Sequence, residues 1–185
     1  MKFARLGDGG ALALEEREPP TAGPGEVVVT LAACGVCGTD LEKVRGNYRT
    51  AGILGHEPVG RIASVGTDVA GLRVGDRVFA HHHVSCGACE VCRRGDPTFC
   101  PTFSRTNLDP GGFAEQFRVP EENVRRGAVL RLDDAVSWDV GALLEPAGVS
   151  QPGELHSRAR AAEIAASRIS IASSISARWT TSGGM

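Results

Sequence analysis

Four cysteines stand close together near the middle of the 185-residue sequence, with the spacing Cys86-x-x-Cys89-x-x-Cys92-x7-Cys100. Four thiolates at such intervals can surround one Zn²⁺ tetrahedrally at about 2.3 Å each, which leaves no coordination position open. The spacing therefore predicts a structural zinc site in a lobe of about residues 84–103. It matches neither common ferredoxin pattern, so an iron–sulfur cluster is a weaker alternative, as are unligated thiols.

A second group of candidate metal ligands is divided between two segments. Cys37 follows an apolar, β-branched run, and His56 with Glu57 stands about 19 residues further on, before another such run. A thiolate, an imidazole and a carboxylate suit a catalytic zinc that keeps one position open. Taken separately, Cys34 and Cys37 could instead be a redox pair, and His56 a hydrogen-bonded polar residue.

The triplet His81-His82-His83 also invites a metal-binding interpretation. Adjacent residues alternate faces on a strand, so at most His81 and His83 would point together. We favour a solvated loop with one imidazole packed near the cleft.

Short β-branched runs separated by glycines dominate the chain up to Gly148. An aromatic content of only 5% and 24 glycines argue against a helix bundle and favour a small β-barrel or sandwich with a few short helices. Thr39 and Glu42 have the spacing of a capping box, and Ser137 is a candidate N-cap. The sequence predicts strands over 26–32, 59–65, 77–80, 113–119 and 129–132, and helices over 40–45 and 137–144.

The composition excludes several classes of function. Lys and Arg number 20 against 22 Asp and Glu, a net charge of −2 at pH 7, whereas nucleic-acid binding needs a concentrated cationic face. No run of about 18 apolar residues is present, and the N-terminal residues lack an apolar signal segment. We therefore expect no nucleic-acid partner, no membrane span and a cytoplasmic location, where clustered cysteines usually bind metals.

A series of motifs occurs in a characteristic order along residues 1–148. This series resembles the zinc-dependent medium-chain alcohol dehydrogenases, in their threonine and sorbitol dehydrogenase branch. The resemblance implies that residues 1–148 form the family's catalytic domain, a GroES-like β-barrel. The motifs are Gly35-Val36-Cys37-Gly38-Thr39-Asp40, Gly55-His56-Glu57-Pro58-Val59-Gly60, Val65-Gly66, Gly75-Asp76-Arg77-Val78, the four-cysteine loop, Gly111-Gly112-Phe113-Ala114-Glu115 and Leu143-Leu144-Glu145-Pro146.

The resemblance assigns metal-binding roles to matching residues. Cys37 and His56 correspond to ligands of the catalytic zinc, and Glu57 to a ligand or an exchangeable near-ligand. Glu145 corresponds to the family's further carboxylate at the metal, with a surface carboxylate as the alternative. Cys34 is not a ligand in this pattern and is expected to pack in the barrel.

Other residues correspond to the groups that handle protons. Thr39 stands where the family has a hydroxyl that relays the substrate proton, and the N-cap of a helix is its alternative role. Asp40 corresponds to the carboxylate that holds the free nitrogen of His56. The family often has a histidine at the position of Glu42 that passes the proton to solvent. Its loss here points to another route or to weaker activity.

The resemblance also implies two zinc ions per chain, one catalytic and one structural, with a small alcohol or polyol as substrate. The alcohol gives up hydride to NAD(P), because no side chain accepts hydride. However, the sequence contains no G-x-G-x-x-G motif after a strand. We therefore expect no Rossmann domain in this chain.

The composition changes after Gly148. Residues 149–185 are rich in Ala, Ser and Arg, with one weakly amphipathic stretch over 161–175. We expect this tail to be a frameshifted or truncated product, with a surface helix and a frayed end as the plainer interpretation. A barrel without the family's closing segment should bind zinc but be inactive alone, marginally stable and prone to associate, including as a homo-oligomer.

Two competing interpretations stay open from the sequence. The first is a non-catalytic zinc-binding interaction module that docks a partner through the cysteine lobe and holds one zinc ion rather than two. The second is a zinc-free quinone or enoyl reductase relative, against which Cys37, His56 and the four cysteines argue.

Overall fold

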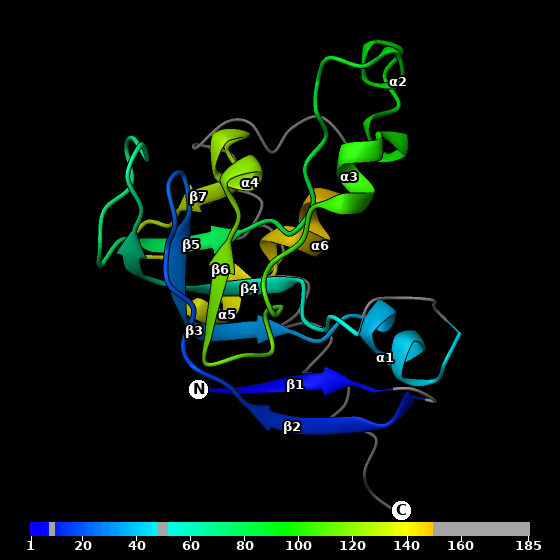
Figure 1. Ribbon diagram of the computed structural model, residues 1–185, viewed down its shortest axis with the longest axis vertical. Coiled ribbons are helices and arrows are strands. Elements are labelled where there is room, and N and C mark those ends of the chain that lie inside the picture. Colours follow the sequence, from blue (N-terminus) through cyan, green and yellow to red (C-terminus); the bar gives the residue numbers. More distant parts are fainter. Residues whose placement is uncertain (8–9, 48–51, 150–185) are drawn as a thin grey trace, which may run out of the picture.

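The structure, a computed structural model, describes residues 1–7, 10–47 and 52–149 (Figure 1). The predicted tail lies outside these residues except for Val149, and so does its stretch 161–175. The described part is mainly β-structure with a few short helices, as predicted. Its strands are β1 (Lys2–Leu6), β2 (Leu12–Glu16), β3 (Val27–Gly35), β4 (Glu57–Val65), β5 (Arg77–Ala80), β6 (Gln116–Val119) and β7 (Val129–Arg131); its helices are α1 (Gly38–Val44), α2 (Glu90–Arg93), the 3₁₀ helix η2 (Pro97–Phe99), α3 (Pro101–Arg105), α4 (Glu121–Arg125), α5 (Trp138–Ala142) and α6 (Leu144–Val149).

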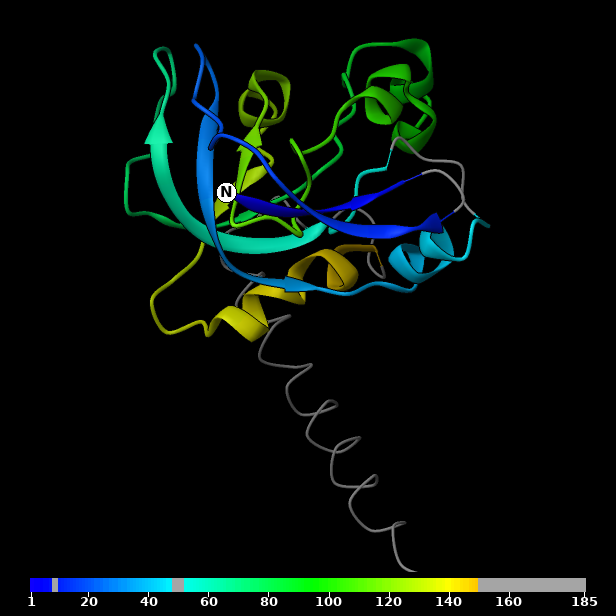
Figure 2. The same ribbon diagram turned by 60° about the horizontal axis from the view of Figure 1, so that its bottom comes forward.

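A five-stranded antiparallel sheet in the order β6-β3-β4-β5-β7 forms the body of the domain. Its two long strands, β3 and β4, pair along their whole length with register shifts at Val28/Val29 and at Leu31/Ala33. Such bulges bend a sheet and increase its twist. Figure 2 shows the result, a strongly curved sheet that wraps around its own interior.

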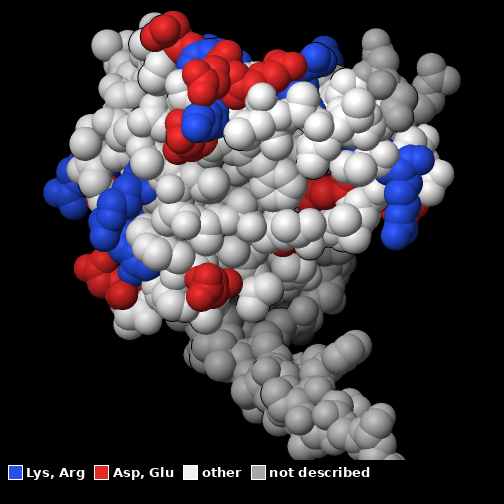
Figure 3. All heavy atoms as spheres, turned by 90° about the horizontal axis from the view of Figure 1, so that it is seen from below, with Lys and Arg blue, Asp and Glu red and all other residues white. Residues whose placement is uncertain are grey.

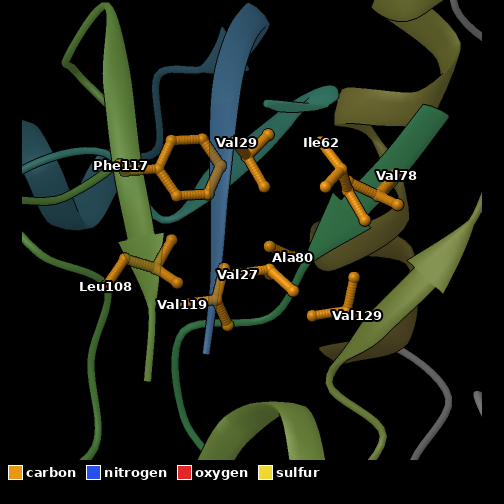
Figure 4. Close-up of a cluster of buried hydrophobic side chains, with 9 residues drawn as sticks. All are labelled: Val27, Val29, Ile62, Val78, Ala80, Leu108, Phe117, Val119 and Val129. Atoms are coloured by element: carbon orange, nitrogen blue, oxygen red, sulfur yellow. The ribbon is translucent and has the colours of Figure 1, made fainter. Parts of the chain in front are cut away.

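The main hydrophobic core fills the concave side of this sheet. Valines at alternate positions of β3, Val27 and Val29, are fully buried, and they meet Phe117 of β6 and Ile62 of β4 (Figure 4). This alternation follows from the two-residue period of a strand. The remaining members of the core are Val78, Ala80, Leu108, Val119 and Val129.

A smaller core lies on the opposite face of the sheet, under helices α5 and α6. Val59 and Phe79 pack there against Ala142 and Leu144. The helices lie along the outer side of the curved sheet in Figure 2. Because α6 carries Glu145, this contact fixes the position of that carboxylate relative to β4 and β5.

A buried arginine holds the loop that leads into α5. The guanidinium of Arg77 donates to the carbonyl oxygens of Asp133, Asp134 and Val136 at 2.9, 2.8 and 2.5 Å. It also lies 4.1 Å from the ring centroid of Trp138, the first residue of α5. Charge-assisted hydrogen bonds of this kind are stronger than neutral ones. Arg77 therefore anchors both α5 and, through it, α6.

The predicted elements agree with the structure except at several boundaries and over 137–144, where the single predicted helix is wrong because α5 ends at Ala142 and α6 begins at Leu144. The strands predicted over 26–32, 59–65, 77–80 and 129–132 correspond to β3, β4, β5 and β7, and Ser137 caps α5 by accepting from Val140 N at 3.4 Å. The strand predicted over 113–119 begins only at Gln116. The capping box predicted for Thr39 and Glu42 is wrong, because Cys37 is the N-cap of α1 and Asp40 is its third residue.

The hairpin of β1 and β2 was not predicted. The leucines of β2, Leu12 and Leu14, are 61% and 71% exposed, so this strand buries no apolar face. It is attached through backbone bonds instead, from Ala4 N to Phe113 O at 2.8 Å and from Glu115 N to Lys2 O at 3.0 Å.

Acidic and basic side chains lie interspersed around the rim of the face in Figure 3, with no extended patch of one sign on it. None of the helices in the described ranges has both the length and the apolar character needed to span a membrane.

A glycine in β4 allows the close approach of β3, which gives a test of the sheet. A Cβ on Gly60 would lie 2.1 Å from the carbonyl oxygen of Thr30, whereas one on Gly38 would meet nothing within 4 Å. We expect Gly60→Ala to lower the free energy of unfolding by about 1–3 kcal/mol, because the strands must separate locally. The matched control Gly38→Ala should cost nothing, because alanine favours a helix. Urea unfolding followed by circular dichroism measures both, and equal stabilities would contradict the pairing.

Candidate metal centres

The four cysteines of the predicted lobe form one cluster that α2, η2 and α3 surround, away from the sheet (Figure 1). The sulfur atoms of Cys89 and Cys92 lie 3.5 Å apart, those of Cys89 and Cys100 3.8 Å, and those of Cys86 and Cys92 3.9 Å. Four sulfurs in a tetrahedron about one zinc ion would be about 3.8 Å apart, given a Zn–S distance near 2.3 Å. The cluster therefore has the dimensions of a tetrahedral zinc–thiolate site.

Backbone N–H groups point at these sulfurs. Cys86 N donates to Cys100 Sγ at 3.3 Å, and Ala88 N and Cys89 N donate to Cys86 Sγ at 3.4 and 3.3 Å. The hydrogen bond from Cys86 N and those from the first turn of α3 lower the pKa of Cys100 to about 5, although burial opposes them. Desolvation and hydrogen bonds with the neighbouring thiols both raise the pKa of Cys92, to about 11. These two thiols therefore differ in how readily they ionise, and a dication bound among the four sulfurs would favour the thiolate form of each.

The second group is assembled around the buried carboxylate of Asp40. Its Oδ2 accepts from Cys37 N at 3.1 Å, which caps the start of α1. Its Oδ1 accepts from Gly55 N at 3.1 Å and lies 3.4 Å from Nδ1 of His56. One side chain therefore joins the end of β3, helix α1 and the segment that enters β4. Asp40 contacts His56 through Nδ1, so Nε2 is the ring nitrogen on the side away from this carboxylate.

Potential ligand atoms of Cys37, His56 and Glu57 lie within 4.8 Å of one another, so the structure groups three of the four residues predicted at this metal, and Glu145 falls outside the group. Glu57 is the first residue of β4 and pairs with Gly35 at the end of β3. A Cβ on Gly35 would lie 1.8 Å from Oε2 of Glu57. The missing side chain of Gly35 is what makes room for this carboxylate.

The titratable groups of this cluster depend on one another. Burial opposes protonation of His56, but Asp40, Cys37 and Glu145 outweigh it and raise the pKa of His56 to about 9. Burial also opposes ionisation of Asp40, but hydrogen bonds from His56 and from backbone N–H groups hold the pKa of Asp40 below its ordinary value. Desolvation raises the pKa of Glu57. Without a metal ion, a proton on His56 provides the positive charge at this position.

Thr39 lies at the edge of the cluster, where Cys37 Sγ is 3.7 Å from Thr39 Oγ1. Because Cys37 is the N-cap of α1, the alternative role of Thr39 as N-cap is wrong, and the hydroxyl is not used for capping. Glu42, by contrast, is on the outer side of α1, where its carboxylate accepts from Arg45 and Asn47 at 2.8 and 2.6 Å.

Glu145 is buried, so the alternative of a surface carboxylate is wrong. It falls into a third group, in which potential ligand atoms of His81, His82 and Glu145 lie within 4.8 Å of one another. The ring centroids of His82 and His56 are 5.0 Å apart, so this group borders the Cys37 cluster. The Coulombic effects of Glu145 on His56 and of Glu57 on Glu145 confirm that the groups are adjacent.

The strand alternation that would let at most His81 and His83 point together does not apply to the triplet. The rings of His81 and His82 are stacked, with centroids 5.2 Å apart and planes at 16°, while Nδ1 of His83 contacts the carbonyl oxygen of Thr106. The alternation rule fails because β5 ends at Ala80, before the triplet begins.

Cys34 belongs to none of these groups. Burial raises the pKa of its thiol to about 12, and its Sγ donates to the carbonyl oxygen of Gly35 at 3.4 Å. A thiol that stays protonated is a poor redox nucleophile. The structure therefore favours the packing role expected for Cys34 over a redox pair with Cys37.

Comparison with known proteins decides the family. The family model described as the alcohol dehydrogenase GroES-like domain matches residues 23–129, more than half of the chain. The chain belongs to this family. The GroES-like domain is similar to L-threonine 3-dehydrogenases, with 36% identity to that of Xanthomonas euvesicatoria and 35% to that of Stenotrophomonas maltophilia, each over 142 residues. These matches cover 73% of this chain but only 40% of the relatives, so the chain spans about two fifths of their length.

Solved structures of medium-chain dehydrogenases share the fold. A protein described as a short chain alcohol dehydrogenase, from Escherichia coli CFT073 and complexed with NADH, superposes with a TM-score of 0.70 at 35% identity, over 81% of this chain and 43% of that one. Galactitol-1-phosphate dehydrogenase from Escherichia coli gives 0.68 at 32% identity, over 80% and 43%. A zinc-binding dehydrogenase from Sinorhizobium meliloti bound to NADP gives 0.69 at 29% identity, over 82% and 45%. The described residues thus form a GroES-like domain of the catalytic type that medium-chain dehydrogenases contain.

Removing the negative charge of Asp40 tests the charge coupling in the Cys37 cluster. In the metal-free chain we expect Asp40→Asn to lower the pKa of His56 from about 9 to near or below its ordinary value of about 6.5, because burial is then unopposed. Glu42→Gln is the matched control, since it removes one charge from the exposed side of the same helix.

The imidazole resonances in NMR spectra recorded against pH measure this pKa, and a His56→Gln spectrum assigns them. Because folding raises the pKa of His56, its protonation stabilises the folded state. This stabilisation is complete at pH values below the pKa that the histidine has in the unfolded chain. That stabilisation is lost as the pH rises through 9. Wild type, but not Asp40→Asn, should therefore lose this stability between about pH 6.5 and 9. An unchanged His56 titration in Asp40→Asn would contradict the assigned contact.

Proposed function

We propose that the chain is the zinc-binding catalytic domain of an NAD(P)-dependent alcohol dehydrogenase acting on a small alcohol or polyol, or on a threonine-type substrate. The observation that carries the proposal is the convergence of Cys37, His56 and Glu57 beside a separate four-cysteine lobe, within a domain of this family. A lobe of four thiolates has the donor set of a structural zinc site, and a Cys/His/Glu set has that of a catalytic one. The similarity to L-threonine 3-dehydrogenases supports the substrate class.

In this proposal Cys86, Cys89, Cys92 and Cys100 hold the structural zinc ion. Cys37, His56 and Glu57 hold the catalytic one, with Glu145 as a further carboxylate beside it. When bound there, zinc supplies Lewis-acid chemistry that lowers the pKa of an alcohol oxygen. The donor sets and the distances within both groups fit such ions.

The side chains of the domain have defined tasks in this reaction. Asp40 orients the His56 ring through Nδ1 and increases the basicity of Nε2. Thr39, whose hydroxyl is 3.7 Å from Cys37 Sγ and is not used for capping, accepts the substrate proton. Glu42 does not continue this route, because it is paired with Arg45 on the outer side of α1.

The hydride acceptor in this proposal is NAD(P), as in the related structures that contain NADH or NADP. The residues described in ranges 1–7, 10–47 and 52–149 do not fit this cofactor. The sequence has no G-x-G-x-x-G motif to receive its pyrophosphate. We therefore propose that the nicotinamide is held by a part of the protein other than this domain, and that the 185-residue chain binds zinc without oxidising alcohols by itself.

Zinc analysis of single variants tests the two centres. We expect Cys92→Ser and Cys37→Ser each to lose one tightly bound zinc ion, and the double variant to lose two, because each serine removes a thiolate ligand from a different site. Atomic emission after dialysis against a weak chelator measures the ratio of zinc to chain. Cys34→Ser is the matched control and should keep both ions. If Cys37→Ser loses none, the chain is better described as a non-catalytic zinc module.

Titration with NADH tests the missing cofactor site. We expect the purified, zinc-loaded 185-residue chain to cause no change in NADH fluorescence and no alcohol-dependent reduction of NAD⁺ or NADP⁺, since its sequence lacks a G-x-G-x-x-G motif to receive the pyrophosphate. A full-length relative with the same domain serves as the positive control. Saturable NADH binding by the chain would refute this part of the proposal.

A further inference from the structure

We propose that Lys43 binds an anionic group of the substrate, a carboxylate or a phosphate, beside the Cys37 cluster. The inference rests on the proposed function, which it narrows to alcohols that carry a negative charge. Lys2 and Lys43 are the only lysines of the 185-residue chain. Lys43 lies in the last turn of α1, the helix whose N-cap is Cys37.

Lys43 projects from the same side of α1 as Asp40. Residues three apart in a helix are neighbours on its surface. Oδ1 of Asp40 accepts from Gly55 N at 3.1 Å, and Nζ of Lys43 donates to the carbonyl oxygen of Ile53 at 3.1 Å. Both side chains therefore contact the short segment that leads directly into His56.

The charge of Lys43 also acts on the imidazoles that border the Cys37 cluster. Burial is the main reason why the pKa values of His82 and His83 are lowered, and the positive charge of Lys43 lowers both further. The ring centroids of His82 and His56 are 5.0 Å apart. The ammonium group thus lies on the side of α1 that faces the candidate metal centre.

This ammonium group is partly buried and has no counter-ion. Within the described ranges no carboxylate forms an ion pair with Lys43. The carboxylate of Asp40 is engaged with backbone N–H groups and with His56 instead. Ile53 uses one of the three N–H donors of an ammonium group. Because a charge withdrawn from water is costly without an opposite charge beside it, an anionic ligand group would stabilise Lys43.

Stabilisation of the end of α1 is the alternative role of Lys43. A cation in the last turn of a helix interacts favourably with the helix dipole and with the last carbonyl groups. However, Nζ of Lys43 donates to Ile53, which lies outside the helix, rather than to a carbonyl of the last turn. This direction favours a ligand-binding role, and the two roles differ in what a loss of the charge would change.

Pairs of alcohols that differ in charge test the proposal. An alcohol that binds at the open position of the Cys37 centre changes the visible spectrum of the cobalt-loaded chain, so its affinity can be measured. We expect 3-hydroxybutyrate to bind about tenfold more tightly than 1,3-butanediol, and glycerol 3-phosphate more tightly than glycerol, because a charge-assisted hydrogen bond is stronger than a neutral one. The pair with the larger difference distinguishes a carboxylate site from a phosphate site.

Variants of the two lysines provide the matched comparison. Lys43→Met removes the charge but keeps an unbranched side chain, and it should abolish the preference for the charged alcohols. Lys43→Arg should retain it, and so should Lys2→Met, which removes a charge from the exposed strand β1. Circular dichroism confirms that the variants fold. No preference in the wild-type chain, or an unchanged preference in Lys43→Met, would overturn the proposal.

NMR spectra of the zinc-loaded chain report on the contact itself. Lysine labelled with ¹³C at Cε gives two side-chain signals, which Lys2→Met assigns. We expect 3-hydroxybutyrate or glycerol 3-phosphate to shift the Lys43 signal, while the Lys2 signal stays unchanged and ADP shifts neither. A Lys43 signal that responds to ADP but to neither charged alcohol would assign Lys43 to phosphates of the cofactor and overturn the substrate role.

The variant Cys37→Ser distinguishes failure of this inference from failure of the proposed function. If Cys37→Ser keeps both zinc ions while the charged alcohols still shift the Lys43 signal, the metal assignment fails and the anion site stands. If Cys37→Ser loses one ion but neither charged alcohol shifts the Lys43 signal of the wild-type chain, the proposed function stands and this inference fails.

Discussion

The arrangement of the Cys37 cluster depends on one buried carboxylate. Asp40 receives hydrogen bonds from the backbone of Cys37 and of Gly55 and contacts the ring of His56. A buried carboxylate is stable only when such donors surround it. The end of β3, the start of α1 and the entrance to β4 therefore have one favourable relative position, and Cys37 and His56 are brought together as a result.

The curved sheet supplies the rigid frame behind this contact. Cys37 follows the end of β3 by two residues and Glu57 begins β4, and these two ends are adjacent because Gly35 pairs with Glu57. The same strands pack on one side against the main core and on the other against α5 and α6. Ligands from distant parts of the chain thus converge because the register of two strands is fixed by burial on both faces.

Much of this arrangement follows from local sequence patterns, whereas the exceptions have tertiary causes. The cysteine spacing and the β-branched runs predict the lobe and strands β3, β4 and β5, because their signals are local. The start of α1 was misplaced because the capping rules name Ser, Thr, Asp and Asn, whereas here Cys37 caps through a backbone contact with Asp40. The pairing of His81 with His82 depends on where β5 ends. The burial of Glu145 depends on the contacts of Arg77 and of α5. Those contacts join residues far apart in the sequence, so the residues around Glu145 do not predict them.

The metal groups differ in how they are distributed along the chain. All four thiolates of the lobe come from one short segment, 86–100, whereas the other groups combine residues near 37, 56, 81 and 145. Closing a short loop costs less conformational entropy than joining distant segments, and contacts remote in sequence form late in folding. The lobe can therefore capture its ion while the rest of the chain is still extended. The Cys37 cluster exists only once the sheet has paired, so its metal occupancy reports on completion of the fold.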